Sequence, residues 1–357
     1  MKEITTPSTI MYHTYLADYA GCGYIRCIFP SMLLSQYIHS GKVAFIPSYN
    51  MHFINDKSYY DRQLFVMFQR SATPEQLKLI KYFKSVFRGP TKTPLIYEID
   101  DLLTDIPEWN FAHPYYSKFS DTAIEIMKCM DGIIVSTNRL RDIYSQYNKN
   151  IEVSGNHLPK FMWGEPQFRG TNNQKPKILW AGSGNHFSQD KTIKGGDFDS
   201  ELISFIKKTT DIYTWVLVGG HPLELKNIHG VEIHGWKSIF EYPNYMKSLN
   251  IDLAIAPLED NVFNSCKSNI KALEYTATGI PAIYSNVEPY KNMTVTAKSS
   301  GEMIQKIESL LGDRDSLGSL WYSDYTRLKS QLFWEENNNL SKYFSKLIKS
   351  FGLKLPK

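Results

Sequence analysis

Short apolar segments alternate with amphipathic helical segments along most of the chain, and this alternation limits the fold more than any other feature. In the first half, the strand-like runs are KVAFIP, RQLFVMF, TPLIYEI and DGIIVST. A helical pattern, PEQLKLIKYFKSVFRG, separates the second run from the third; it begins with Pro74 and ends at Gly89. Strands that alternate with helices predict βαβ units and a parallel sheet.

The stretch KFMWGEPQFRGTNNQKP interrupts this alternation, which then restarts with KILWAGS, YTWVLVGG, VEIHG, IDLAIAPL and PAIYS. A chain of 357 residues is also long for one domain. We therefore predict two tandem α/β domains, residues 1–165 and 177–320, joined by a linker at 166–176. Residues 321–357 are helical and aromatic, and we expect this tail to pack back on the domains. A ligand is expected in a cleft between the domains, at the carboxyl ends of the strands.

Composition narrows the setting in which the protein works. The formal net charge of +4 permits a polyanionic partner without requiring one. The four cysteines form neither a CxxC pair nor a zinc-ligand spacing, which favours free thiols in a reducing compartment. No apolar signal core opens the chain, and no run of eighteen apolar residues occurs in it. We therefore expect a soluble, cytoplasmic protein without a membrane span.

The segment KSNIKALEYTATGIPAI, residues 267–283, places charges at the start of a helix that is otherwise apolar. If the helix begins near Ser265, capped by that residue or Asn264, then Lys267, Lys271 and Glu274 share one face. Free N–H groups and two lysines at a helix N-terminus suit a phosphate or diphosphate. The glutamate would accept hydrogen bonds from the vicinal hydroxyls of a ribose. An ordinary Lys–Glu pair on a solvated face is the alternative.

Residues 251–285 resemble the C-terminal donor site of GT-B glycosyltransferases, especially the retaining family-4 type. In that family an E-x7-E element precedes a small-G-x-P turn; Glu274 matches the second glutamate, and TGIP follows it. Cys266 stands in place of the first glutamate, which leaves the contact to the donor sugar open. The pattern APLEDNVFNSCKSNIKALEY is closer to a bacterial and bacteriophage subgroup. The resemblance implies GT-B architecture, a UDP-sugar as donor, Glu274 on the ribose, and retention at the anomeric carbon.

Other segments extend this resemblance. AGCGYIRCIFPSMLL is similar to the subgroup's GxGYyR element, KILWAGSGNHFSQD to the first strand and loop of the donor domain, and VEIHGWKSIFEYPNYM to the base-binding loop. Taken singly, the glycines, the histidine and the tryptophan also fit structural roles; Asp190 is expected to fix its loop. The expected donor-binding residues are Gly21, Gly23, Tyr24, Arg26, Ser183, Gly184, His186, Trp236, Asn264, Lys267, Ser268, Asn269, Lys271 and Glu274.

The stretch PLIYEIDDLLTDIP ends a strand with Glu98, Asp100 and Asp101. One interpretation is the metal-binding E/D-x-D site of GT-A enzymes, but the second α/β domain and the resemblance favour GT-B. There Asp100 or Asp101 would act as a base on the acceptor hydroxyl or stabilise positive charge on the sugar, and His113 is a further candidate base. Loop acids and N-caps are the structural alternative. Because lysines and a helix N-terminus would stabilise the leaving diphosphate, we expect neither a metal nor a cofactor besides the nucleotide sugar.

The acceptor is predicted from a basic stripe, Lys81, Lys84 and Arg88, on the helix of residues 74–89. Such a stripe binds nucleic-acid phosphates or is simply solvated. With the bacteriophage resemblance, it leads to the prediction that the acceptor is 5-hydroxymethylcytosine in double-stranded DNA, in the host cytoplasm. The alternatives are a surface or lipid-linked glycan as acceptor, and a non-catalytic protein that binds a sugar nucleotide or nucleic acid. A dinucleotide oxidoreductase is disfavoured, because no G-x-G-x-x-G follows a strand.

Overall fold

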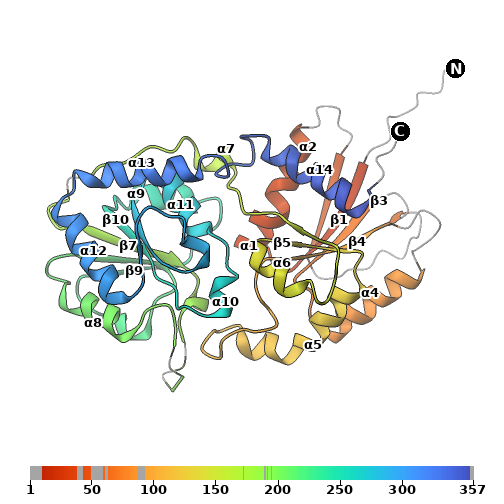
Figure 1. Ribbon diagram of the computed structural model, residues 1–357, viewed down its shortest axis with the longest axis horizontal. Helices are drawn as coiled ribbons and strands as arrows, with labels where there is room; N and C mark the ends of the chain where they lie inside the picture. The colour runs from red at the N-terminus through yellow and green to blue at the C-terminus, as the bar shows by residue number, and fades with distance from the viewer. Residues whose placement is uncertain are drawn as a thin grey trace. The chain divides into compact units, whose positions relative to one another are not determined.

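The computed structural model of the chain describes residues 10–37, 43–49, 59–60, 63–86, 93–171, 173–188, 190, 192–193 and 195–353. Among these residues lie two six-stranded sheets in which all strand pairs are parallel (Figure 1). Each sheet belongs to one of two compact units. Unit 1 comprises residues 1–104, 118–156 and 334–357, and unit 2 comprises residues 105–117 and 157–333. The prediction of parallel α/β sheets is therefore confirmed.

The sheet of unit 1 has the strand order β2-β1-β3-β4-β5-β6. β3, β4 and β5 are buried along their whole length, which explains why they appear in the sequence as nearly continuous apolar runs. The strands are β1 Ile10–Leu16, β2 Val43–Tyr49, β3 Gln63–Gln69, β4 Leu95–Ile99, β5 Gly132–Val135 and β6 Ile151–Val153. The helices are α1 Gly21–Gly23, a π-helical turn Tyr24–Ile28, α2 Phe29–Tyr37, α4 Pro74–Val86, α5 His113–Cys129, α6 Asn138–Tyr144 and α14 Asn339–Phe351.

Helix α14 completes the core of unit 1, although it comes from the end of the chain. Its residues Leu347 and Phe351 join a buried cluster with residues of β1, α2 and β3. The Phe351 ring packs directly on the backbone of β5, because a Cβ at Gly132 would collide with it. A glycine at this position in a strand thus permits the close approach of an aromatic ring.

The sheet of unit 2 has the order β12-β11-β10-β7-β8-β9. Its strands are β7 Lys177–Gly182, β8 Thr214–Gly219, β9 Val231–His234, β10 Leu253–Ala256, β11 Ala282–Ser285 and β12 Thr296–Ala297. Its helices are α7 Lys160–Trp163, the 3-10 turn Gly184–His186, α8 Ser200–Lys208, α9 Tyr242–Ser248, α10 Val262–Ser265, α11 Ile270–Thr278, α12 Ser300–Gly312 and α13 Ser316–Leu328.

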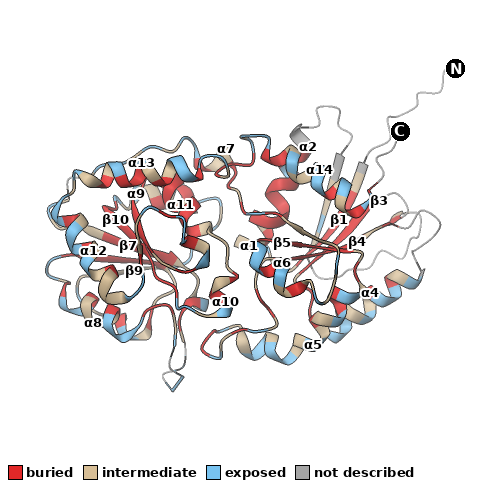
Figure 2. Ribbon diagram, viewed as in Figure 1, coloured by how far each residue is buried: buried red, intermediate tan, exposed pale blue. Residues whose placement is uncertain are grey.

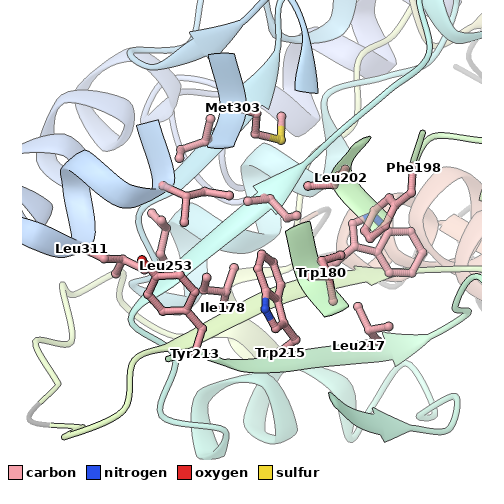
Figure 3. Packing of buried hydrophobic residues seen from close by; sticks show 14 of the residues in the cluster. Ile178, Trp180, Phe198, Leu202, Tyr213, Trp215, Leu217, Leu253, Met303 and Leu311 are labelled. Atoms are coloured by element: carbon pink, nitrogen blue, oxygen red, sulfur yellow. The ribbon is translucent and has the colours of Figure 1, made fainter. Parts of the chain in front are cut away.

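The core of unit 2 is rich in large side chains. Figure 3 shows Trp180 of β7 and Trp215 of β8 in one cluster with Leu202 of α8 and with Met303 and Leu311 of α12. In Figure 2 the strands are mostly red, for buried, whereas the outer faces of helices such as α8 and α12 carry pale blue, exposed residues. This packing fixes the central strands, and therefore the loops at their carboxyl ends.

Two segments group differently from the predicted domain boundaries. Residues 105–117, predicted within the first domain, pack with unit 2. The predicted tail divides, because α13 belongs to unit 2 whereas α14 belongs to unit 1. Among the described helices, none combines the length and the apolar character needed to cross a bilayer.

Candidate functional site

Glycine backbone lies at the carboxyl ends of β7 and β8, two neighbouring strands of unit 2. Gly182 ends β7 and Gly219 ends β8, with a φ of 90° at Gly219. The Gly220 N–H donates to the Gly182 carbonyl at 2.7 Å. A Cβ at Gly219 would collide with that carbonyl, and one at Gly220 would lie 2.7 Å from Gly184. The two loops can approach each other this closely only because these positions have no side chains.

Lys271, in the first turn of α11, is the cation of this region. Its buried ammonium group donates to the Ala181 carbonyl of β7 and lies 4.7 Å from the centre of the Trp180 ring. Burial lowers the pKa of Lys271 to about 8, although the negative charges of Glu274 and Asp197 act in the opposite direction. Among the described residues no carboxylate is bonded to Lys271, and a lysine with little hydration in such a position is well suited to bind an anionic ligand.

Glu274 lies one turn further along α11 than Lys271. It is half-buried, and the Tyr242 hydroxyl of α9 donates to its Oε2 at 3.3 Å. Burial raises the pKa of Glu274 to about 7, while Lys271 opposes that rise. The prediction that the lysine and the glutamate share a helix is confirmed, and the glutamate can accept further hydrogen bonds.

The start of this helix differs from the prediction. A separate helix, α10, is capped by the Asn261 side chain, which accepts from the Asn264 N–H at 2.7 Å, and α11 begins only at Ile270. The expectation that Asn264 or Ser265 caps one continuous helix is therefore wrong. Lys267 lies in the connection, with its ammonium group 4.4 Å from the centre of the Phe263 ring, and Ser268 and Asn269 follow it. At the other end, Gly279 has a φ of 82° and terminates α11 as its sequence indicates.

His186 belongs to a buried polar network at the carboxyl ends of β7 and β10. Its Nδ1 lies 2.5 Å from Oδ2 of Asp197. The other oxygen, Oδ1, accepts from the Asn264 side chain at 2.8 Å and from the Glu259 N–H at 3.0 Å. Burial lowers the pKa of His186 to about 4, and Lys271 lowers it further against the effect of Asp197, so the imidazole is neutral at pH 7. Asn264, predicted to bind the donor, is fully buried and serves to hold this network together.

The segment of residues 105–117 contributes groups that the sequence analysis missed. The Trp109 indole N–H donates to Glu259 Oε2 at 2.8 Å, and Asn110 donates from its side chain to the Asn185 carbonyl at 2.9 Å. Gly195 provides the space for the Trp109 ring, because a Cβ there would collide with it. No local pattern in the sequence marks these contacts, nor does one mark Asp197 or Tyr242; the paired glycines after β8 are the one signal that was visible.

The remaining predicted donor residues of unit 2 lie close to the same strand ends. Trp236 is 61% exposed, and its ring lies beside the backbone of Gly219, where a Cβ would be 3.3 Å from the ring. Ser183 precedes the 3-10 turn that Gly184 opens. Asp190 accepts from the Thr192 N–H at 2.8 Å, as expected of a residue that fixes its loop. The structure thus places Trp236, Gly184, His186, Lys271 and Glu274 around the carboxyl ends of β7 and β8.

A cavity of about 960 Å³ opens at the carboxyl edge of the same sheet, beside α8 and α12. Asp197 and Glu259 line it, but Lys271 and Glu274 do not. Its other lining residues are Phe187, Ser188, Asp190, Ile193, Gly195, Gly196, Phe198, Asp199, Ser200, Ile203, Pro222, Leu223, Glu224, Pro257, Leu258, Asp260, Ser285, Asn286, Val287, Ala297, Lys298, Ser299, Ser300 and Met303. The cavity therefore borders the polar network at Asp197 and Glu259 but does not reach Lys271 or Glu274.

In unit 1, Arg26 has a different environment from the one expected of a donor ligand. Its guanidinium is buried and pairs with Glu98 at 2.7 Å; it also donates to the Ser154 carbonyl at 2.7 Å and to Asn156 at 2.9 Å. Burial raises the pKa of Glu98, and Arg26 acts in the opposite direction. Through these contacts Arg26 joins the ends of β4 and β6, and its role as a donor ligand stays a prediction.

The motif around Arg26 is explained in part by local packing. A Cβ at Gly23 would collide with the Asp18 carbonyl, and the Asp18 side chain accepts from the Gly23 N–H at 3.0 Å. Gly21 has open space around it, and the half-buried Tyr24 ring lies 5.3 Å from that of Phe29. Of the two glycines, Gly21 alone leaves room for a ligand.

The two candidate bases of unit 1 are both paired with one arginine. Arg70 binds Asp100 at 2.5 Å and Asp101 at 2.9 Å. Its φ of 46° is uncommon for a residue with a side chain, and such conformations gather at functional sites. His113, the third candidate, begins α5 in the segment that packs with unit 2, so the structure groups it with unit 2 and the two aspartates with unit 1.

The predicted acceptor stripe is described only in part, because Arg88 lies outside the described residues. Lys81 forms an exposed ion pair with Glu125 at 3.2 Å. Lys84 donates to the Cys129 carbonyl at 2.5 Å. Both lysines therefore bind α4 to α5 in this structure.

Comparison with solved structures supports the fold. Sucrose-phosphate synthase from Thermosynechococcus elongatus matches with a TM-score of 0.64 and 11% identity, over 97% of this chain and 100% of that one. UDP-GlcNAc 2-epimerase from Neisseria meningitidis, solved with UDP-GlcNAc, matches with a TM-score of 0.51 and 10% identity, over 96% and 100%. A variant of TarM from S. aureus, in complex with UDP, matches with a TM-score of 0.53 and 12% identity, over 82% of this chain and 55% of that one.

No family model matches the chain, and the search of curated proteins gave no match. The identities to the solved structures are low, so these likenesses concern the fold. Two parallel sheets with flanking helices, in the arrangement these structures share, give the chain the GT-B architecture of two Rossmann-like domains.

Proposed function

We propose that the protein is a glycosyltransferase that moves a sugar from a UDP-sugar to an acceptor hydroxyl. The observation that carries the proposal is the pair Lys271 and Glu274 on α11, where a partly desolvated cation lies at the carboxyl end of β7 and a carboxylate follows it one turn further along the helix. A diphosphate and a ribose diol are the chemical groups that this pair fits. The GT-B architecture and the UDP-bound neighbours support the same ligand.

In this proposal the nucleotide lies along the strand ends of unit 2. The exposed Trp236 stacks on the base, Glu274 accepts from the ribose, and Lys271 binds the diphosphate. During transfer, the bond between the anomeric carbon and the diphosphate oxygen breaks, and Lys271 stabilises the charge left on that oxygen. The acceptor oxygen bonds to the anomeric carbon, and its proton passes to a base, for which Asp100, Asp101 and His113 are the candidates.

For the acceptor, we propose 5-hydroxymethylcytosine in double-stranded DNA, on the strength of the bacteriophage resemblance and the basic residues of α4. A surface or lipid-linked glycan is the alternative acceptor.

A second function is favoured by one observation: Cys266, in place of the first glutamate of the family-4 pattern, is fully buried at the end of α10. Since it cannot contact a donor sugar there, the second candidate is a protein that binds UDP-sugars without transferring the sugar.

The test incubates the protein with UDP-glucose, UDP-galactose or UDP-GlcNAc and hydroxymethylcytosine-containing DNA, and measures UDP release and nucleoside mass. A hexose added to the nucleoside supports both donor and acceptor. UDP release with an unchanged nucleoside contradicts the DNA acceptor, and an epimerised or hydrolysed sugar contradicts transfer.

The variants Lys271→Met and Lys207→Met separate these outcomes from contamination. Lys207 is an exposed lysine of α8, so its variant should keep full activity, whereas the Lys271 variant should lose it. UDP-sugar binding without turnover under any acceptor would favour the non-catalytic candidate.

A further inference from the structure

His186 and Asp197 are hydrogen-bonded to each other through both their side chains and their backbones. The two residues flank the tip of the loop between β7 and α8, and the Asp197 N–H donates to the His186 carbonyl at 2.9 Å. A bridge between Phe187 and Gly196 fixes the same two backbone segments. Both Asp197 oxygens are used, one by His186 and the other by Glu259 and Asn264. Asp197 therefore cannot turn away without breaking several hydrogen bonds, and His186 cannot do so without losing its bond to Asp197.

This network determines which nitrogen of His186 carries the proton. A carboxylate can only accept, so Nδ1 must donate its proton to Asp197 Oδ2. Because the imidazole is neutral at pH 7, Nε2 is left as a lone-pair acceptor. In the described part of the chain no group hydrogen-bonds Nε2, and the His186 side chain is 11% exposed. Nε2 is thus an oriented and accessible acceptor without a donor in the described structure.

Along the sheet, His186 Nε2 lies on the far side of Lys271 from Trp236, and therefore beyond the position proposed for the diphosphate. Trp236 lies beside Gly219 at the end of β8, and Tyr242 of α9 orients Glu274. Lys271 lies at the end of β7, next in the sheet. The His186 network spans β7 and the following strand, β10, through Asp197 and Glu259. A nucleotide with its base on Trp236 and its diphosphate on Lys271 therefore directs its sugar toward His186.

We infer that His186 Nε2 accepts a hydrogen bond from a hydroxyl group of the donor's sugar, and that Asp197 is a positioning residue that fixes the tautomer this contact requires. A phosphate oxygen is excluded as the partner of Nε2, because two acceptors cannot share a hydrogen bond. The inference rests on the proposed function, since it assumes that UDP-sugars bind at Lys271. It adds that the site selects a hydroxyl-bearing sugar through His186.

Two variants that keep the packing test the contact. His186→Phe retains a ring against Trp180, whose centre lies 5.4 Å from that of His186, but removes the nitrogens. In Asp197→Asn, the oxygen can still accept from Glu259 and Asn264, while the new amide donates to Nδ1 and leaves the proton on Nε2. His229→Gln, at an exposed histidine before β9, is the matched control. Calorimetry with UDP, UDP-glucose and UDP-GlcNAc measures each affinity.

Both variants should keep the wild-type Kd for UDP, and His186→Phe should weaken binding of the UDP-sugar by about fivefold to tenfold, the effect of one lost hydrogen bond. Asp197→Asn turns Nε2 into a donor, which a sugar hydroxyl can still accept, so this variant tests the tautomer rather than the loss of the bond. Equal weakening of UDP and UDP-sugar would overturn the inference, because the contact would then be to the nucleotide. An unchanged UDP-sugar affinity in His186→Phe would also overturn it. If wild-type protein binds no UDP at all, the proposed function fails with it, whereas UDP binding without a His186 effect refutes this inference alone.

A measurement without ligand tests the tautomer directly. Nitrogen-15 NMR of the histidine rings at neutral pH should show His186 protonated on Nδ1 and bare on Nε2, and Asp197→Asn should reverse this. An imidazolium, or a wild-type ring protonated on Nε2, would refute the positioning role of Asp197.

Discussion

Raising the pH from 7.5 to 9.5 should weaken UDP binding through the loss of one proton from Lys271. The pKa of this lysine is about 8 because burial disfavours its charged form. If only the protonated lysine binds the diphosphate, the apparent Kd is inversely proportional to the protonated fraction. That fraction falls from about three quarters to about 3% over this range, so the Kd should rise about 25-fold.

Other groups near the site interfere little in this range. His186, with a pKa of about 4, stays neutral throughout. Glu274, with a pKa of about 7, is already mostly ionised at pH 7.5, and its remaining ionisation favours ribose binding and opposes the trend only slightly. The terminal phosphate of UDP is also ionised above pH 7, as is that of other phosphate monoesters.

Calorimetric titration with UDP at half-unit pH steps gives the required curve. Lys271→Met should bind weakly at pH 7.5 and lose the pH dependence, while Lys207→Met should reproduce the wild-type curve. A wild-type change of less than threefold, or an equally steep curve for Lys271→Met, would refute the assignment of the diphosphate to Lys271.

Three further changes test separate parts of the site. Trp236→Ala should weaken UDP binding by about 1–3 kcal/mol, the range for base–aromatic stacking, without lowering Tm, since the ring is exposed; an unchanged Kd would exclude the stacking role. The pKa of Glu274 is raised from about 4.5 in the unfolded chain to about 7 in the folded protein. The contribution of this group to stability is therefore fully present below pH 4.5 and is lost as the pH rises through 7. Denaturant unfolding should therefore show that the free energy of unfolding decreases less from pH 5 to pH 7.5 for Glu274→Gln than for wild type. An equal decrease would contradict the burial of the Glu274 charge. Gly219→Ala should lower the free energy of unfolding by about 2 kcal/mol or more, because the residue has a positive φ and its Cβ would collide with the Gly182 carbonyl. The control Gly312→Ala, with open space around the residue, should keep the wild-type Tm in a thermal melt. Equal Tm values for the two variants would show that the β8 loop tolerates a side chain.

The fold was predictable because it depends on local patterns. The apolar runs that become β3, β4, β5, β7, β8 and β10 are visible in the sequence because these strands are buried on both faces. β1 was missed, since its run IMYHTYL contains His13 and Thr14. His13 is nonetheless fully buried, because both ring nitrogens have hydrogen-bond partners, Tyr59 and Ser48, each at 2.8 Å. A polar residue satisfied by distant partners gives no signal in its own segment.

Of the candidate site, only the part that depends on local sequence was predictable. The spacing of Lys271 and Glu274 on one helix is a local property, and the sequence identified it. The break between α10 and α11 was not visible, because the Asn261 cap marks only the start of α10, and no recognised signal after Ser265 shows that a new helix begins at Ile270. Asp197 and Trp109 come near Glu259 only through long-range packing, so no window of sequence contains that information.

The place of α14 in unit 1 has a consequence for how the protein is made. A ribosome releases the strands of the first sheet early, but the helix that contributes Leu347 and Phe351 to their core emerges only after all of unit 2. The usual order, in which the N-terminal domain folds first, is therefore not open to this chain. Unit 2 can complete its sheet while the first sheet still lacks one covering helix, so the nascent chain is most exposed to aggregation and to chaperones at its oldest part.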